Sequence, residues 1–111
     1  MYHEKGDILI KGACKIICRI FKHSAVFRIG GDEFVAIIRE ATDEKIDEVF
    51  DLFVKAMEET WSNDEPELQI SVAYGYAKYN PDTDANKIEL AFKRADEMMY
   101  IKKSEMKKRM R

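Results

Sequence analysis

Two strand-forming runs separated by only three residues place the tightest constraint on the fold of this chain. Ala25–Ile29 and Glu33–Arg39 are both rich in β-branched and aromatic residues, which favour extended backbone. Gly30, Gly31 and Asp32 are all that lies between the two runs. Because so short a connection joins antiparallel neighbours, the pattern predicts a β-hairpin.

Helical and extended patterns on either side of the hairpin predict the remaining elements. An amphipathic helix is expected to open at Asp7, whose carboxylate would cap it. A second helix is expected to start at residues 42–44, and a surface loop follows at residues 62–66. A long strand is predicted over Leu68–Tyr79, and a final helix from near Asp84. The inward-facing positions predicted for the last two helices are Ile46, Val49, Phe50, Phe53, Met57 and Trp61, then Leu90, Ala91, Ala95, Met98 and Met99.

The composition is typical of one globular domain, expected to span residues 1–111. Hydrophobic residues make up 46% of the chain and charged residues 36%, and the net charge is -2. This charge predicts no attraction to nucleic acid, and no apolar run is long enough to cross a bilayer. The N-terminus lacks the apolar segment of a secretion signal, so a cytoplasmic location is expected.

The predicted order is helix, strand, strand, helix, strand, helix, which is an α+β pattern. It equals a ferredoxin-like βαββαβ unit without its first strand. That strand would lie in the sheet interior, so the hairpin and the last strand must pair directly, leave a gap or borrow a strand from another chain. We expect a sheet of three main strands with helices on one face, in a chain prone to association.

The residues in and after the predicted turn support two interpretations. Gly30 and Gly31 can both adopt positive φ, so a plain hairpin turn explains them fully. Asp32 and Glu33 are less easily explained, because a carboxylate beside a buried strand is desolvated unless a cation neutralises it. Arg28 could supply a structural ion pair. The alternative is a phosphate and metal site, because divalent cations prefer carboxylate oxygens and glycine lets a phosphate approach the backbone.

Four segments, in the same order, resemble motifs of the GGDEF family, the bacterial diguanylate cyclases. GGDEF itself lies at residues 30–34, and HEKGD at residues 3–7 is similar to the end of the family's GHxxGD segment. SVAYG at residues 71–75 resembles a late strand of the family, with Ala73 where glycine is usual. ADEMMYIKK at residues 95–103 resembles the closing AD-x-x-LY-x-AK helix. The resemblance covers nearly the whole chain and implies a nucleotidyl-cyclase-type fold.

The resemblance implies a role in cyclic di-GMP signalling. Enzymes of this family condense two GTP molecules into cyclic di-GMP and pyrophosphate, with Mg²⁺ or Mn²⁺ bridging the phosphates and two domains facing each other in a homodimer. By the motif match, Glu33 would ligate the metal and Asp32 would take part in catalysis. Gly30 and Gly31 would approach the nucleotide, and Asp7 would accept hydrogen bonds from guanine.

Two lysines of the last predicted helix match phosphate-binding positions of the family. Lys103 matches the lysine that holds the terminal phosphates. Lys107 stands where an arginine is usual, which keeps the charge but loses the bidentate fork. By spacing alone, both lysines belong to a basic helix end that complements the helix dipole and needs no ligand. Asp7 likewise keeps the alternative role of a helix cap, which need not exclude contact with guanine.

Two departures from the family pattern bear on activity and its control. The family's first strand carries an aspartate that binds both metals, a Phe-Lys pair and an asparagine that pairs with guanine, and residues 1–111 contain no counterpart. Glu33 alone is a poor cage for magnesium, so little or no cyclase activity is expected of this chain alone. The family's inhibitory Arg-x-x-Asp positions are Phe21 and Ser24 here, so no inhibitory site is expected.

Two classes of function therefore stay open. The intact GGDEF motif, Asp7 and Lys103 favour the catalytic C-terminal part of a diguanylate cyclase. The absent metal aspartate, Lys107 and the absent inhibitory site favour a non-catalytic GGDEF-type module that binds nucleotide or a protein partner and regulates.

Overall fold

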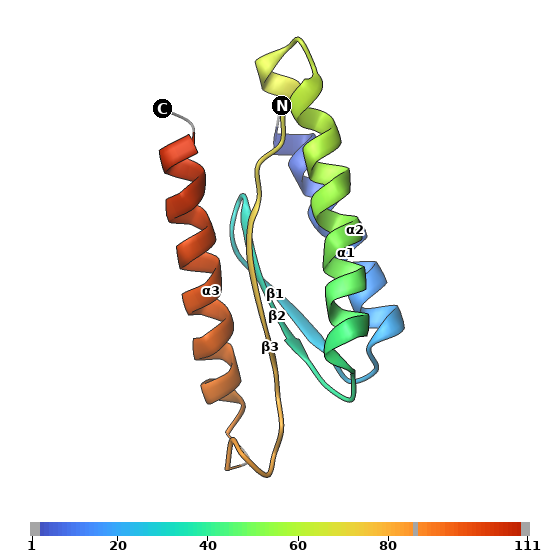
Figure 1. Cartoon of the computed structure of the whole chain (residues 1–111), viewed down its shortest axis with the longest axis vertical. Coiled ribbons are helices and arrows are strands. Elements are labelled where there is room, and N and C mark those ends of the chain that lie inside the picture. Colours follow the sequence, from blue (N-terminus) through green and yellow to red (C-terminus); the bar gives the residue numbers. More distant parts are fainter. Residues whose placement is uncertain (1–2, 86, 110–111) are drawn as a thin grey trace.

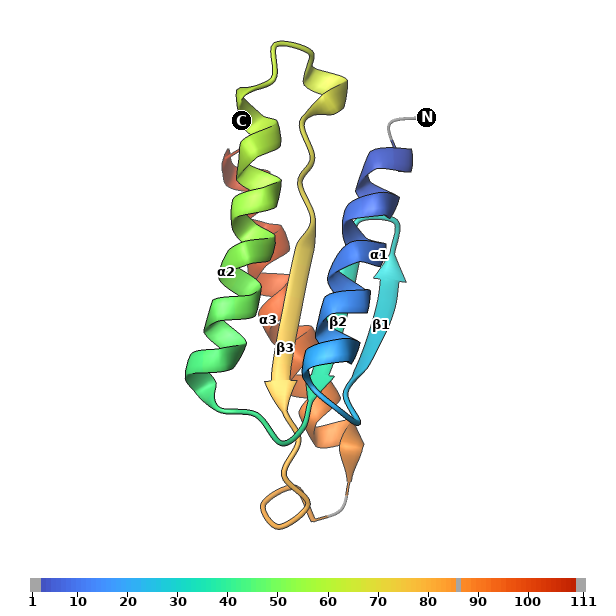
Figure 2. The ribbon, with the colours of Figure 1, turned by 90° about the vertical axis from the view of Figure 1, so that its right-hand side faces the viewer.

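The fold is a three-layer arrangement of helices around one small sheet. The structure, a computed structural model, describes residues 3–85 and 87–109. Helices α1 and α2 lie on one face of the sheet, and α3 lies on the other (Figures 1 and 2). The predicted α+β class and element order are confirmed. The elements are α1 (His3–Ile20), β1 (Ala25–Gly30), β2 (Glu33–Ile38), α2 (Asp43–Glu59), the short 3-10 helices Thr60–Ser62 and Pro66–Leu68, β3 (Ala73–Lys78) and α3 (Ile88–Arg109).

The three strands form one sheet in the order β1-β2-β3. β1 and β2 are antiparallel, with Phe27 opposite Val35, so the predicted hairpin is confirmed. β2 and β3 are parallel, with Val35 opposite Gly75. The hairpin and the last strand therefore pair directly, which is one of the three arrangements that the sequence left open.

Strand β2 is covered on both faces, so the expectation of helices on one face is wrong. Phe34, Ala36 and Ile38 belong to the core beneath α1 and α2. Val35 and Ile37 belong to a second core beneath α3. All five side chains are at most 1% exposed. A continuous apolar run is typical of a strand buried on both sides, because successive side chains point to opposite faces.

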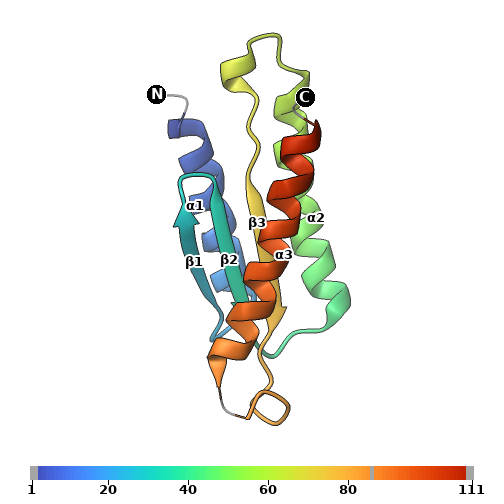
Figure 3. The same cartoon turned by 90° about the vertical axis from the view of Figure 1, so that its left-hand side faces the viewer.

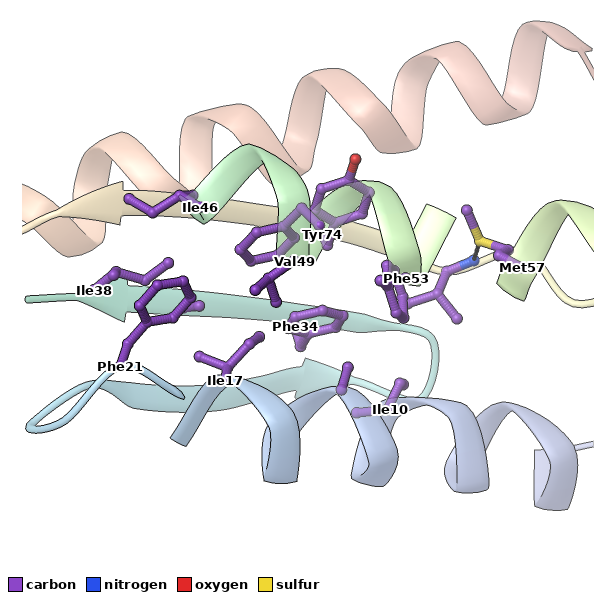
Figure 4. Packing of buried hydrophobic residues seen from close by; sticks show 14 residues of the cluster. Ile10, Ile17, Phe21, Phe34, Ile38, Ile46, Val49, Phe53, Met57 and Tyr74 are labelled. Atoms are coloured by element: carbon purple, nitrogen blue, oxygen red, sulfur yellow. Dashed lines mark hydrogen bonds between the residues drawn. The ribbon is translucent and has the colours of Figure 1, made fainter. Parts of the chain in front are cut away.

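The larger core lies between the sheet and the helices α1 and α2 (Figure 4). The Phe34 ring packs edge-on against Phe53, with 5.4 Å between the ring centroids. Phe50 stacks on Tyr74 at a centroid distance of 5.5 Å. Trp61, predicted to continue the apolar stripe of α2, lies in the first 3-10 helix and is half-buried. The other predicted stripe positions are all buried, namely Ile46, Val49, Phe50, Phe53 and Met57.

Helix α2 begins where the sequence predicts, whereas α1 and α3 do not. Thr42 Oγ1 accepts a hydrogen bond from Lys45 N at 3.2 Å and caps α2. Helix α1 already includes His3, so Asp7 lies inside the helix, and its predicted role as a cap is wrong. Helix α3 begins at Ile88 and not near Asp84.

Asp84 anchors the turn that precedes α3. Its carboxylate accepts hydrogen bonds from Arg94 at 2.8 and 3.1 Å and from Asn80 N at 3.1 Å. Arg94 also donates to Lys78 O at 2.8 Å, which ties the end of β3 to α3. The hydrogen bond from Arg94 is the main reason why the pKa of Asp84 lies below its ordinary value. Asp84, near which the last helix was expected to begin, therefore stabilises the turn between β3 and α3.

Strand β3 begins at Ala73, so the prediction of a strand from Leu68 is wrong at that end. The preceding residues follow an irregular path that side chains hold in place. The Thr60 hydroxyl accepts a hydrogen bond from Ile70 N at 2.8 Å, and Trp61 Nε1 donates to Ile70 O at 2.7 Å. These side chains satisfy the main-chain groups that a neighbouring strand would otherwise bond.

Helix α3 lies close against β3 because Gly75 has no side chain. A Cβ atom on Gly75 would overlap the Ala95 carbonyl oxygen and lie 2.7 Å from Met99 N. Small residues on the helix complete the contact, since Ala91 and Ala95 are fully buried.

Of the remaining inward positions predicted for α3, Met99 is buried, Met98 is half-buried and Leu90 is 42% exposed, so Leu90 was wrongly predicted. Within residues 3–85 and 87–109, no helix is long and apolar enough to cross a membrane.

The Gly75 contact predicts a large effect of adding one methyl group. Gly75→Ala should lower the free energy of unfolding by about 3 kcal/mol or more, because main-chain atoms of α3 cannot move aside as a flexible side chain can. Urea denaturation followed by circular dichroism measures the change. Gly12→Ala in α1 is the matched control, because its Cβ would meet open space, and a gain of roughly 0.5 to 1 kcal/mol is expected. Equal stability of the two variants would contradict this account of the α3 contact.

The Asp84–Arg94 ion pair predicts an acid-sensitive part of the stability. Because the pKa of Asp84 is lowered from 3.8 on folding, its contribution is complete above that value and is lost as the pH falls through the lowered folded pKa. Asp84→Asn should therefore destabilise the protein at about pH 6, and the difference from wild type should shrink towards about pH 3. Thermal melts across this range measure it. Asp82→Asn, an exposed neighbour, should show no such trend, and a constant Asp84→Asn difference would refute the linkage.

Candidate functional site

The GGDEF turn lies at one end of the sheet, where three elements of the fold meet. The tip of the β1–β2 hairpin is at the same end of the molecule as the first turns of α1 and the C-terminal half of α3 (Figures 2 and 3). Asp7 projects from α1, Asp32 and Glu33 come from the hairpin, and Lys103 comes from α3. Residues from distant parts of the sequence are thus brought together around the turn.

Arg28 connects helix α1 to the hairpin turn. Its guanidinium forms an ion pair with Asp7 and donates to the carbonyl oxygens of Gly30 and Gly31. Lys11 Nζ lies 3.7 Å from the other carboxylate oxygen of Asp7. The hydrogen bond from Arg28 is the main reason why the pKa of Asp7 lies below its ordinary value, so Asp7 is ionised near neutral pH.

Arg28 forms a structural ion pair, but with a different partner from the one considered in the sequence. It was a candidate to neutralise an acid of the GGDEF motif, and it pairs with Asp7 instead. Side chains on a strand alternate between its two faces, and Arg28 and Glu33 occupy different faces of the hairpin. That alternation was the available signal, because side chains on different faces of the hairpin cannot reach each other across the sheet.

Glu33 is neutralised by Lys103 across the face that α3 covers. The Lys103 ammonium group forms an ion pair with Glu33 Oε2. The Glu33 side chain is 12% exposed, and that of Lys103 is 38% exposed. The hydrogen bond with Glu33 is the main cause that raises the pKa of Lys103, with a further contribution from the charge of Asp32. The expectation that Glu33 needs a cation is confirmed, although the cation is a lysine of α3.

The two glycines of the turn differ from each other in their surroundings, and neither has the backbone conformation that was predicted. No glycine in the structure has positive φ, so the proposed use of left-handed backbone at Gly30 and Gly31 is wrong. A Cβ on Gly30 would lie 2.6 Å from Glu33 Oε1, so Gly30 makes room for that carboxylate. A Cβ on Gly31 would meet open space, which leaves its backbone accessible from outside.

Asp32 and Lys107 are the most solvent-accessible of the predicted site residues. The Asp32 carbonyl accepts a hydrogen bond from Ala73 N at 2.9 Å, which extends the pairing of the turn with β3. The Asp32 side chain is directed to solvent, with no hydrogen bond or ion pair to the part of the chain that the structure describes. Lys107 is exposed on α3, and the structure does not bring it into contact with the GGDEF turn.

Phe21 and Ser24, which stand at the positions of the family's inhibitory motif, serve the fold. Phe21 is 2% exposed and belongs to the larger core. The Ser24 hydroxyl accepts a hydrogen bond from Arg39 N at 3.1 Å, at the far end of the hairpin from its tip. Both side chains are therefore occupied by structural contacts.

The donor set at the turn does not by itself fit a divalent cation. Glu33 and Asp32 are adjacent carboxylates, but Glu33 is already paired with Lys103. The described residues contain no group of three or more His, Cys, Asp or Glu side chains that could hold a metal ion. Mg²⁺ and Mn²⁺ prefer several oxygen ligands in near-octahedral geometry, which these two residues cannot supply.

Comparison with known protein families agrees with this geometry. A family model described as Diguanylate cyclase, GGDEF domain, matches residues 3–109, which is nearly the whole chain. No curated protein and no solved structure matches the chain. The matched range includes the hairpin, Asp7 and Lys103, so all the elements around the turn fall within it. The chain therefore belongs to the GGDEF family of diguanylate cyclase domains.

Proposed function

We propose that this GGDEF domain is a signalling module that binds GTP at the hairpin tip and, as residues 1–111 alone, makes little or no cyclic di-GMP. The observation that carries the proposal is the position of Lys103 beside the GGDEF turn. An ammonium group held next to an accessible glycine backbone is a favourable place for a phosphate. Cyclic di-GMP is the product expected when the family's complete site is present.

The ion pair between Glu33 and Lys103 leaves capacity for a ligand. A lysine ammonium has three donors, and Lys103 uses one of them on Glu33. Its side chain is 38% exposed, so a phosphate oxygen can reach it from solvent. The raised pKa keeps Lys103 charged at neutral pH, which favours an anion. Lys107, one helical turn further, is proposed to add a second positive charge for the terminal phosphates.

Asp7 is the proposed acceptor for the guanine base. A carboxylate can only accept hydrogen bonds, so it suits the edge of guanine, which presents N–H donors. The edge of adenine includes a ring nitrogen that is itself an acceptor and cannot bond to a carboxylate. The ion pair with Arg28 fixes the Asp7 side chain and keeps it ionised, while the side chain stays 39% exposed. Because Arg28 also binds the carbonyls of Gly30 and Gly31, the base and phosphate positions are held at a defined separation.

Catalysis is the part of the family activity that these residues support least. Asp32 and Glu33 are the proposed catalytic acids, and Glu33 the proposed ligand of Mg²⁺ or Mn²⁺. Because the turn does not fit a divalent cation unaided, no metal-dependent step is assigned to this chain. The condensation also requires two GTP-loaded domains, so the proposal includes a homodimer. We further propose that the protein acts in the cytoplasm and does not bind nucleic acid.

A regulatory module that binds a protein partner is the second candidate. An apolar groove of about 220 Å³ lies between α1 and α2 on the surface opposite α3. Exposed apolar side chains line it, including Ile8 at 65% and Leu52 at 59% exposure. This groove is the observation that favours the second candidate, because an exposed apolar surface suits a protein partner better than a nucleotide phosphate.

Lys103→Ala is expected to weaken GTP binding by about tenfold, since a hydrogen bond from a charged donor to phosphate contributes roughly 1.5 to 3 kcal/mol. Isothermal titration calorimetry with GTP and with guanosine measures this, and the loss should be confined to GTP. Lys108→Ala is the matched control, an exposed lysine of the same helix, and it should bind GTP as wild type does. An equal loss for GTP and guanosine would contradict a phosphate role for Lys103.

Purified protein incubated with GTP and Mg²⁺ or Mn²⁺ is expected to form little or no cyclic di-GMP, because two adjacent carboxylates cannot hold the cations. Chromatography of the nucleotides measures the product. Asp32→Asn with Glu33→Gln sets the background. Steady turnover above that background would refute the prediction and establish an enzyme, whereas GTP binding without turnover supports the module.

A further inference from the structure

The two edges of the sheet differ in how they are protected. At the β3 edge, Val72 N donates a hydrogen bond to Met57 Sδ at 3.2 Å, and Tyr76 N donates to Met98 Sδ at 3.4 Å. Met57 belongs to α2 and Met98 to α3, so each of two helices supplies one acceptor atom along this edge. Main-chain donors that are already engaged cannot pair with another strand.

The β1 edge carries less protection, since the irregularity between Arg28 and Gly30 affects only its turn end. Within residues 3–85 and 87–109, β2 is the only strand that pairs with β1. Figure 3 shows β1 at the margin of the sheet, beside the part that α3 crosses. Phe27 and Ile29 are each 43% exposed. Edge strands usually carry free charges that prevent pairing, but the one charge of β1, Arg28, is bound to Asp7.

The α3 side of the β1 edge also has space for an incoming side chain. The Phe27 ring contacts Phe92 of α3 edge-on, with 5.6 Å between the ring centroids. Beside this pair is a groove of about 370 Å³, which has an apolar part lined by Phe27, Phe92, Ile37 and Ile88 and a charged part lined by Glu89, Lys93 and Asp96. Ala25, opposite Ile37 in the sheet, is too small to fill the space at this end of β1.

We propose that β1 pairs antiparallel with β1 of a second copy of this chain, so that two sheets join into one of six strands. The pairing is centred on Phe27. This register places Ala25 opposite Ile29 of the partner subunit, which adds an apolar side chain where the groove is open. It also places Arg28 opposite Val26 of the partner subunit. Centring on Arg28 would instead set two like charges directly opposite each other, which is destabilising.

The proposed interface closes after two copies. A two-fold axis at Phe27 uses the β1 edge of both chains, and the β3 edges that remain outside are occupied by Met57 and Met98. A self-complementary contact of this kind gives a dimer and not a fibre. The interface is independent of the proposed function, because it lies along β1 and needs no nucleotide.

Sedimentation velocity over a concentration series, without nucleotide, tests the interface. Wild type should form a monomer–dimer equilibrium with no larger species. Phe27→Lys with Ile29→Lys should raise the dimer dissociation constant by about tenfold or more, because two apolar contacts per chain are replaced by like charges. Ile8→Lys with Leu52→Lys, which changes exposed apolar residues of the α1–α2 groove, should leave it unchanged.

Three results of that experiment would overturn the proposal. These are a monomer at every concentration, larger oligomers, or a dimer that only the Ile8 and Leu52 changes dissociate. Circular dichroism of both double variants shows whether they are folded. Titration with GTP is a separate readout, so a failure of nucleotide binding does not affect this conclusion.

Disulfide trapping tests the register without introducing charge. In a background of Cys14→Ser and Cys18→Ser, Phe27→Cys should form an intermolecular disulfide on mild oxidation, because facing Cβ atoms are about 5 Å apart. Ile29→Cys is the matched control, since its copies would be about 13 Å apart, four positions out of register. Cross-linking of Phe27→Cys alone supports the register, and cross-linking of both or of neither refutes it.

Discussion

The burial of β2 on both faces is the constraint on which the other elements depend. Phe34, Ala36 and Ile38 require α1 and α2 on one side, and Val35 and Ile37 require α3 on the other. Direct parallel pairing with β3 completes the enclosure, and the crossover through α2 connects the two strands. Helix α3 can approach closely only because Gly75 presents no side chain to it. The small sheet is thus stabilised mainly by its helices and less by its number of strands.

The sequence predicted the elements of the fold better than their arrangement. The hairpin, the Thr42 cap and the buried stripe of α2 follow from local propensity and periodicity, which neighbours in the sequence determine. The prediction of helices on one face of the sheet was wrong because it followed the ferredoxin-like pattern. The run from Phe34 to Ile38 has apolar residues on both faces of the strand, which indicates helices on both sides. The start of β3 was wrong because Thr60 and Trp61 bind Ile70, and a propensity scale does not include such contacts.

The site was predictable as a set of residues but not as a set of pairs. Family motifs named Asp7, Glu33 and Lys103, and ion pairs connect all three to the hairpin. Which cation meets which carboxylate depends on the side of each strand and on how α3 crosses the sheet. Glu33 therefore forms an ion pair with Lys103, and Arg28 forms one with Asp7. The space beside Gly30 is by contrast local, because the carboxylate that occupies it belongs to Glu33, its partner in the hairpin.

The Glu33–Lys103 ion pair joins residues that are 70 positions apart in the chain. Closing so long a loop has a large entropic cost. This cost is compensated only once β2, α2 and β3 are already in place. The Glu33–Lys103 contact is therefore one of high contact order. A ligand at the proposed phosphate position beside Lys103 would contact only those chains in which the last helix has docked, so its binding would report completed folding.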